Sequence, residues 1–134
     1  MILVIDANVL IAAFLKVSTC RKIMLSEDIS LCSPDWLKDE FKSNEEVLRK
    51  KFKSRVDFSE TKDILFKFIR IVNSSEYSAF IPEASKLTRH IGDIPYFAAA
   101  LKLDCAIWSE EKSFKQQSKV MVYSTSDLIK VLDL

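Results

Sequence analysis

Short apolar runs alternate with longer amphipathic stretches along the whole chain, and this alternation constrains the fold more than any other feature. The first run, residues 2–5, is continuously aliphatic, which is typical of a strand buried on both faces of a sheet. Similar runs predict strands at residues 29–32, 77–81, 105–108 and 120–123. Helical patterns fill the intervals, at residues 8–16, 19–26, 34–52, 59–72, 83–90, 93–103, 110–116 and 125–132. Strands joined by helices require right-handed crossovers, so we expect a three-layer α/β/α domain with a parallel sheet of roughly five strands.

Length and composition agree with a single domain over residues 1–134. A chain that is 49% hydrophobic and 29% charged has ordinary globular usage, which argues against disorder. No apolar run approaches the roughly 20 residues that a membrane span needs. The three cysteines form no Cys-x-x-Cys pair and indicate reduced thiols. We therefore expect a cytoplasmic protein without a membrane segment.

Ligands of open parallel sheets bind beyond the carboxyl ends of the strands, so the residues that follow each strand matter most. Asp6 and Asn8 follow the first predicted strand, and Ser109 follows the fourth. A chain with one glycine, Gly92, cannot contain the glycine-rich phosphate loops of nucleotide-binding proteins. His90 is the single histidine, which excludes a histidine-rich metal site. Acidic side chains remain as the candidate chemistry.

Two acids in the first half of the chain have both a structural and a functional interpretation. Asp6 ends a buried strand, where it either caps the next helix or serves a site, and Asn8 can itself cap a helix that begins at Val9. Glu40 lies four residues after Trp36, within the apolar stripe of its helix. A carboxylate on that side needs a cation or a hydrogen-bond donor. The alternative is a lysine-paired acid at the edge of the stripe.

The acids in the second half have similar alternatives. Asp93 precedes a helix with proline in its first turn, where an aspartate is a typical N-cap. Glu110 and Glu111 follow Ser109, a candidate N-cap, so both glutamates can simply complement a helix dipole.

Taken together, four acids favour a metal site. Asp6, Glu40, Asp93 and Glu111 come from four separate predicted elements near one edge of the sheet. Carboxylates gathered in this way repel one another unless a divalent cation neutralises them. Oxygen ligands without cysteine or histidine suit Mg²⁺ or Mn²⁺, which can activate water for phosphodiester hydrolysis.

These motifs resemble those of the PIN-domain family, which includes the toxin ribonucleases of VapBC-type toxin–antitoxin pairs. Four segments carry the resemblance in order: VIDANVLI at residues 4–11, LKDE at 37–40, DIPYFAAAL at 93–101 and AIWSEEKSF at 106–114. The resemblance implies a parallel five-stranded sheet and a metal-dependent endoribonuclease. It also implies RNA as substrate, with an antitoxin protein and a homodimer as possible partners.

By the same resemblance, Asp6, Glu40 and Asp93 are expected to bind the metal, and Asn8 and Ser109 to orient the cluster or its water. Glu111 stands where the family usually has aspartate, and we expect it to act as the fourth acid. His90 stands three residues before Asp93, where many members carry another acid. These two departures motivate an alternative, a catalytically silent PIN-like module that binds RNA or protein.

A basic run follows the predicted helix at residues 34–52. The net charge of +1 gives no global basic field, so RNA binding requires a local patch. The candidates for it are Arg49, Lys50, Lys51, Lys53 and Arg55. They can hold an RNA backbone through counterion release, or they can be a solvated helix end that complements the dipole. His90 has the same two interpretations, a phosphate contact or a structural histidine.

Overall fold

The structure is a computed structural model that describes residues 1–15 and 18–134. Within these residues, five parallel strands form one sheet in the order β3-β2-β1-β4-β5. The strands are β1 (Ile2–Ile5), β2 (Ser30–Pro34), β3 (Ile69–Val72), β4 (Ala106–Trp108) and β5 (Val122–Tyr123). Val4 of β1 lies opposite Cys32 of β2 and Ile107 of β4, which fixes the register of the central strands.

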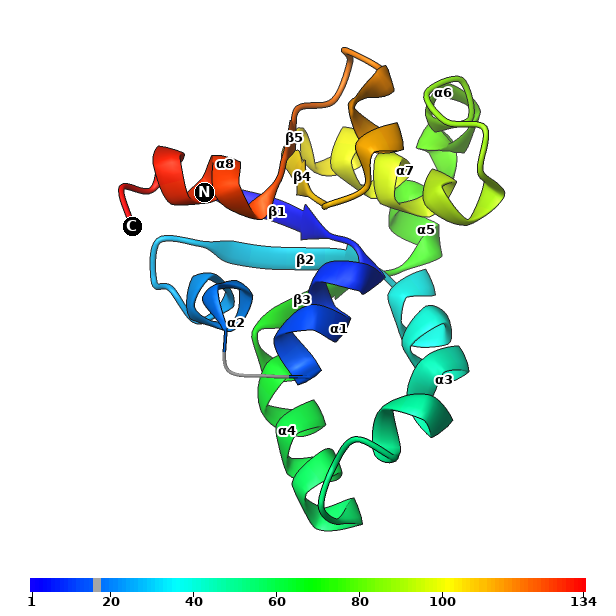
Figure 1. Ribbon diagram of the computed structural model, residues 1–134. Helices are drawn as coiled ribbons and strands as arrows, with labels where there is room; N and C mark the ends of the chain where they lie inside the picture. The colour runs from blue at the N-terminus through cyan, green and yellow to red at the C-terminus, as the bar shows by residue number, and fades with distance from the viewer. Residues whose placement is uncertain (16–17) are drawn as a thin grey trace.

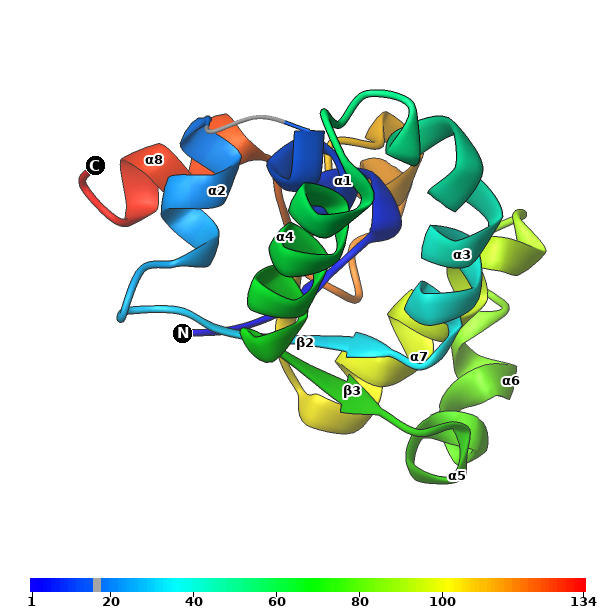
Figure 2. The same cartoon turned by 90° about the horizontal axis from the view of Figure 1, so that it is seen from below.

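Helices cover both faces of this sheet, as Figure 1 and the perpendicular view in Figure 2 show. One face carries α1 (Ala7–Leu15), α2 (Thr19–Met24), α4 (Arg55–Lys67) and α8 (Thr125–Val131), and α3 (Trp36–Arg49) packs against α1. The other face carries α5 (Ser74–Tyr77), α6 (Ile81–Ala84) and α7 (Ile94–Leu103), with the short 3₁₀ helices η1 (Ser78–Phe80), η2 (Ile91–Asp93) and η3 (Lys112–Gln116). The predicted α/β/α architecture is confirmed. Among the described helices, none is long and apolar enough to cross a membrane.

The central strand supplies both hydrophobic cores because its side chains alternate between the two faces. Leu3 and Ile5 belong to the core under α1 to α4, and Val4 belongs to the core under α7. Phe14 of α1 packs edge-on against Phe41 of α3, with ring centroids 5.1 Å apart. This contact fixes the last turn of α1 relative to α3, the helix that carries Glu40.

Helix α7 packs close to the sheet because three consecutive alanines give it a small buried surface. Ala98, Ala99 and Ala100 are all buried and lie in one core with Phe97 and Ile107. The close packing holds the first turn of α7 beside the carboxyl ends of the strands. Asp93 is the N-cap residue of this helix.

Four of the five predicted strands lie within two residues of their predicted positions, but the one predicted at residues 77–81 is wrong. Those residues are helical, in α5, η1 and the start of α6, and the third strand is β3. The helix predicted at 59–72 ends at Lys67, and β3 follows it. The prediction ran too far because the helical spacing of apolar residues continues into the β-branched residues of β3. The predicted helix at 110–116 is the shorter 3₁₀ helix η3, and 83–90 is mostly turn. Residue 16, the last of the helix predicted at 8–16, lies outside the described residues.

Candidate metal centre

The strand order places a binding crevice between β1 and β4. The chain runs outward from β1 to β2 and β3 on one side, and from β4 to β5 on the other, so the order reverses between β1 and β4. Such a reversal opens a crevice at the carboxyl ends of the two strands. Asp6 follows β1 directly and Ser109 follows β4 directly. The backbone N–H of Asp6 donates to the carbonyl of Trp108 at 3.4 Å, which places the two strand ends side by side.

All four predicted acids line one small cavity at this crevice, which we call the acidic pocket. Its volume is about 60 Å³. Its walls are formed by Asp6, Ala7, Asn8, Glu40, Asp93, Tyr96, Glu111 and Phe114. The acids come from four places in the chain: the start of α1, the middle of α3, the start of α7 and the segment after β4. The fold therefore brings together carboxylates that are up to 105 residues apart in the sequence.

Asp6 both caps α1 and faces the pocket. Only 4% of its surface is exposed, and its Oδ1 accepts the backbone N–H of Val9 at 2.9 Å. Its Oδ2 accepts the hydroxyl of Ser109. Burial raises the pKa of Asp6 from 3.8 to about 6, although both hydrogen bonds act to lower it. Helix α1 begins at Ala7, so the cap is Asp6 and not Asn8.

Asn8 and Glu111 form a second pair in the pocket. The amide Nδ2 of Asn8 donates to Oε1 of Glu111 at 2.8 Å. The backbone N–H of Glu111 donates to the Ser109 hydroxyl oxygen at 3.0 Å. Ser109 therefore links Asp6 to the segment that carries Glu111 and does not cap a helix, because Glu111 is the N-cap of η3. Glu110 points elsewhere, since its Oε1 accepts the backbone N–H of Thr125 at 2.6 Å.

Glu40 lies on the half-buried side of α3 and has a tyrosine as its donor. The hydroxyl of Tyr96 donates to Oε1 of Glu40 at 2.7 Å. Burial raises the pKa of Glu40, the Tyr96 hydrogen bond lowers it, and the negative charge of Asp93 raises it further. The lysine-paired alternative for Glu40 does not hold among the described residues, which give it no ion pair.

Tyr96 was missed by the sequence analysis, although a signal for it was present. It follows Asp93 by three residues on the same helix, and residues three apart share a helix face. A tyrosine at that spacing therefore points to the same side as the acid at the helix start.

Asp93 occupies the N-cap position of α7, but in the described structure its side chain makes no capping hydrogen bond. Burial raises its pKa, the positive charge of His90 lowers it and the charge of Glu111 raises it. The carboxylate is thus left open to the pocket.

The donor set fits a hard divalent cation in its chemistry. It offers carboxylate oxygens alone, and the pKa values of Asp6, Glu40 and Asp93 are all raised. An oxygen-rich, negatively charged cluster is what Mg²⁺ and Mn²⁺ prefer. In the part of the chain that the structure describes, however, no three such side chains are grouped closely enough to hold one ion. Glu111 and Glu40 are held by Asn8 and Tyr96, so side-chain rotations must precede coordination.

The basic run lies away from the acidic pocket. Arg49 ends α3 nine residues after Glu40, which is about 14 Å along the helix. Its guanidinium bonds to Glu45 and lies over the ring of Phe58, 5.2 Å from the centroid. Arg55 begins α4. The run therefore joins α3 to α4 at the far end of α3 from the acids.

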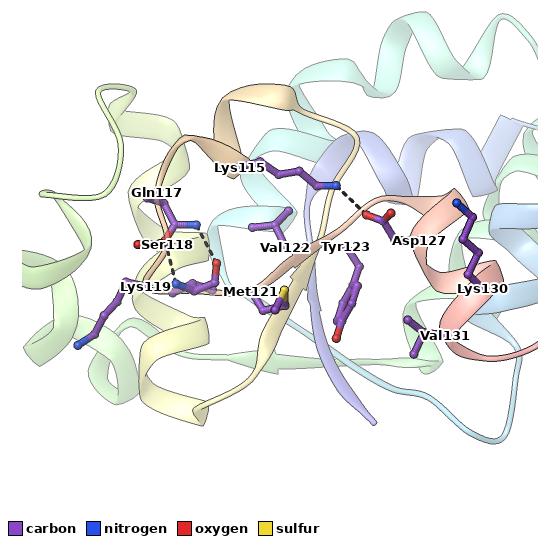
Figure 3. A pocket seen from close by; sticks show the side chains of 11 residues that line it. Lys115, Gln117, Ser118, Lys119, Met121, Val122, Tyr123, Asp127, Lys130 and Val131 are labelled. Atoms are coloured by element: carbon purple, nitrogen blue, oxygen red, sulfur yellow. Dashed lines mark hydrogen bonds and ion pairs between the residues drawn. The ribbon is translucent and has the colours of Figure 1, made fainter.

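A larger hollow of about 640 Å³ lies at the β5 edge of the sheet (Figure 3). Two of the three lysines that line it are paired: Lys115 with Asp127 at 2.7 Å and Lys119 with Glu83 at 3.5 Å. Gln117 bonds to both backbone groups of Val120 and braces the loop. None of the four predicted acids lines it.

Comparison with known proteins agrees with this architecture. The chain is similar to one in the crystal structure of VapBC2 from Rickettsia felis bound to a DNA fragment from their promoter. The match has a TM-score of 0.72 at 14% sequence identity and covers 92% of this chain and 98% of that one. No curated protein matches the sequence. The family model of the PIN domain matches residues 4–125, and the chain therefore belongs to the PIN domain family.

Proposed function

We propose that this protein is a Mg²⁺- or Mn²⁺-dependent endoribonuclease that hydrolyses RNA phosphodiester bonds at the acidic pocket. The observation that carries the proposal is the meeting of Asp6, Glu40, Asp93 and Glu111 in one pocket at the switch point of the sheet. When bound there, a divalent cation would neutralise the acids, polarise the phosphate and activate water. Asp6, Glu40 and Asp93 would hold it, with Glu111 as the fourth acid.

The chain's own residues prepare the pocket for this role. Ser109 and the start of α1 orient the two oxygens of Asp6, so that its carboxylate cannot rotate freely. Tyr96 orients Glu40 in the same way. Asn8 holds Glu111, whose extra methylene gives it the reach to swing toward the cluster once it leaves the amide. The donors to Asp6 therefore pre-organise its carboxylate, whereas Glu40 and Glu111 have to rotate before they can bind a cation.

RNA cleavage by the full chain tests the proposal. Short single-stranded and hairpin RNAs are incubated with the chain and Mn²⁺, and the products are separated on a denaturing gel. We expect cleavage that EDTA abolishes and that Asp6→Asn reduces at least 100-fold, in line with the loss of a central electrostatic group. Glu111→Gln is expected to reduce cleavage, whereas Glu110→Gln is the matched control, because Glu110 bonds to Thr125 outside the pocket.

The silent binding module is the competing outcome of this experiment. It predicts no cleavage by the unaltered chain, RNA binding that Asp6→Asn leaves intact, and no saturable Mn²⁺ binding. The observation that favours the silent module is that Glu111 and Glu40 accept hydrogen bonds from Asn8 and Tyr96 and, in the described part of the chain, are not grouped with a third acid around a common point.

We further propose that the chain is the toxin of a toxin–antitoxin pair, with an antitoxin protein as its partner. Membership of the PIN domain family and the fold shared with a chain of the Rickettsia felis VapBC2 complex support this proposal. A homodimer is part of the same proposal. Light scattering of the purified chain tests the homodimer, and growth arrest on expression, relieved by the product of an adjacent small gene, tests the toxin.

A further inference from the structure

A second polar cavity lies beside the acidic pocket and is lined by cations. Its volume is about 560 Å³, in the range of small-ligand sites. We call it the cationic hollow, and six of its lining residues carry the argument: Lys86, Thr88, Arg89, His90, Ser113 and Gln116. Within the described part of the chain, no acidic side chain lines it.

The cationic hollow and the acidic pocket share the same two walls. His90 is the N-cap of η2, whose last residue is Asp93, so one wall runs from the hollow into the pocket. The other wall is η3, where Ser113 faces the hollow and the next residue, Phe114, lines the pocket. The two cavities are thus flanked by the same two short segments, η2 and η3.

The groups in the hollow are free to bind an anion. Among the described residues, Lys86, Arg89 and His90 form no ion pair, in contrast to the paired lysines at the β5 edge. The Thr88 hydroxyl accepts the backbone N–H of His90 at 3.2 Å, which leaves its own hydrogen available. The hollow thus offers guanidinium, ammonium and hydroxyl donors without a competing carboxylate, the combination that binds phosphate oxygens.

We propose that the cationic hollow is a subsite for a backbone phosphate of single-stranded RNA next to the bond that is cut. This inference rests on the proposed function and adds to it the path of the substrate. The acids of the pocket repel an RNA strand, so the neighbouring cations supply the attraction that holds it in place. The subsite also accounts for His90 and assigns strand binding to a surface other than the run of Arg49 to Arg55.

An RNA fits this hollow better than an acidic protein does. Protein interfaces are anchored by buried apolar and aromatic side chains, whereas the lining of the hollow is dominated by polar groups, with Leu87 as its one apolar member. Strand-binding grooves combine backbone-tracking cations with hydroxyl and amide donors.

The test measures binding of a fluorescent 12-nucleotide single-stranded RNA to the full chain by anisotropy, in Ca²⁺ and over a range of salt concentrations. The altered chain carries Lys86→Ala with Arg89→Ala. The matched control carries Lys22→Ala with Lys130→Ala, which removes the same charge from two exposed lysines that form no ion pair among the described residues, of which Lys130 lies at the β5 edge (Figure 3). We expect the first pair to weaken binding roughly tenfold and to reduce the slope of log affinity against log salt by about 0.7, the contribution of the one phosphate that the subsite holds. The control should change affinity less than twofold.

Four other results would overturn the inference. Unchanged RNA affinity in the first pair, with Mn²⁺-dependent cleavage of RNA still present, would refute the subsite and leave the proposed function standing. Equal losses in both pairs would show a general charge effect. If polyglutamate bound with the same affinity as the RNA, and Lys86→Ala with Arg89→Ala weakened its binding as much, the hollow would be assigned to an acidic protein. Absence of both RNA binding and cleavage in the unaltered chain would instead refute the proposed function, and the subsite with it.

Discussion

Removing the charge of Asp6 is expected to stabilise the fold while it removes the activity. The buried carboxyl has a pKa of about 6 in the folded chain, against 3.8 when it is fully solvated. At 1.36 kcal/mol for each factor of ten in proton affinity, its ionised form costs about 3 kcal/mol of folding free energy at neutral pH. In Asp6→Asn, the amide oxygen can still accept the Val9 N–H, and the Ser109 hydroxyl can rotate to accept the amide hydrogen. Most of the 3 kcal/mol should therefore be recovered.

The sign of the pH dependence follows from the raised pKa. Between pH 3.8 and about 6, the folded chain binds more protons at Asp6 than the unfolded chain does, so its contribution to stability falls as the pH rises through this window. The gain in the free energy of unfolding from Asp6→Asn is thus absent near pH 3.5 and complete above pH 7. For a chain of this length, about 3 kcal/mol corresponds to a rise in Tm of roughly 9 °C.

Thermal unfolding followed by circular dichroism at pH 7.5 and pH 4, in EDTA, measures this effect. The exposed Asp63→Asn is the matched control and should shift Tm by less than about 2 °C at either pH. Adding Mn²⁺ should raise the Tm of the unaltered chain and leave that of Asp6→Asn unchanged. A lower Tm for Asp6→Asn at pH 7.5 in EDTA would refute the reasoning, because it would show that the ionised carboxylate stabilises the fold.

Three further substitutions test the packing and the pocket. Phe14→Ala should lower the free energy of unfolding by about 3–5 kcal/mol in urea titrations, because Phe14 is fully buried among aromatic rings. Tyr77→Phe should cost about 1–2 kcal/mol in the same assay, since it removes the 2.6 Å hydrogen bond to Asp35. Tyr96→Phe should raise the pKa of Glu40, so that the acidic limb of the pH–rate profile for RNA cleavage moves to higher pH, and an unmoved limb would contradict this assignment.

The positions of four of the five strands and the meeting of Asp6 with Ser109 were within reach of the sequence because both depend on local pattern. The aliphatic run at Ile2–Ile5 has a single interpretation, and Asp6 must then lie at the end of a central strand. Parallel strands align their carboxyl ends, so the residues after β1 and β4 had to meet wherever those strands paired. The position at a strand end also distinguished Asp6, as a candidate site residue, from the acids on the exposed faces of the helices.

The rest depended on tertiary contacts that local pattern does not encode. The boundary between α4 and β3 falls inside a continuous apolar stripe, and only the pairing of Ile69–Val72 with β2 selects a strand there. The sequence does not distinguish Glu110 from Glu111 as the acid of the pocket. The structure does, because the first backbone N–H of α8, that of Thr125, donates to the carboxylate of Glu110 and keeps it outside the pocket. Tyr96 shares a helix face with Asp93 by its spacing, but its bond to Glu40 joins residues that are 56 apart in the sequence, which local pattern does not predict.

Burial, and not the internal hydrogen bonds, keeps Asp6 and Glu40 of the acidic pocket difficult to ionise. Asp6 has two donors and Glu40 has a tyrosine, yet burial outweighs them and both pKa values are raised. More donors would have stabilised the charges at the expense of the free oxygens that a cation needs. The pocket is thus left with unneutralised charge whose natural complement, in our proposal, is a divalent cation, and the cationic hollow next to it supplies the charge that the RNA needs. Fold stability and cation affinity then oppose each other at Asp6, which is why a single substitution is expected to move them in opposite directions.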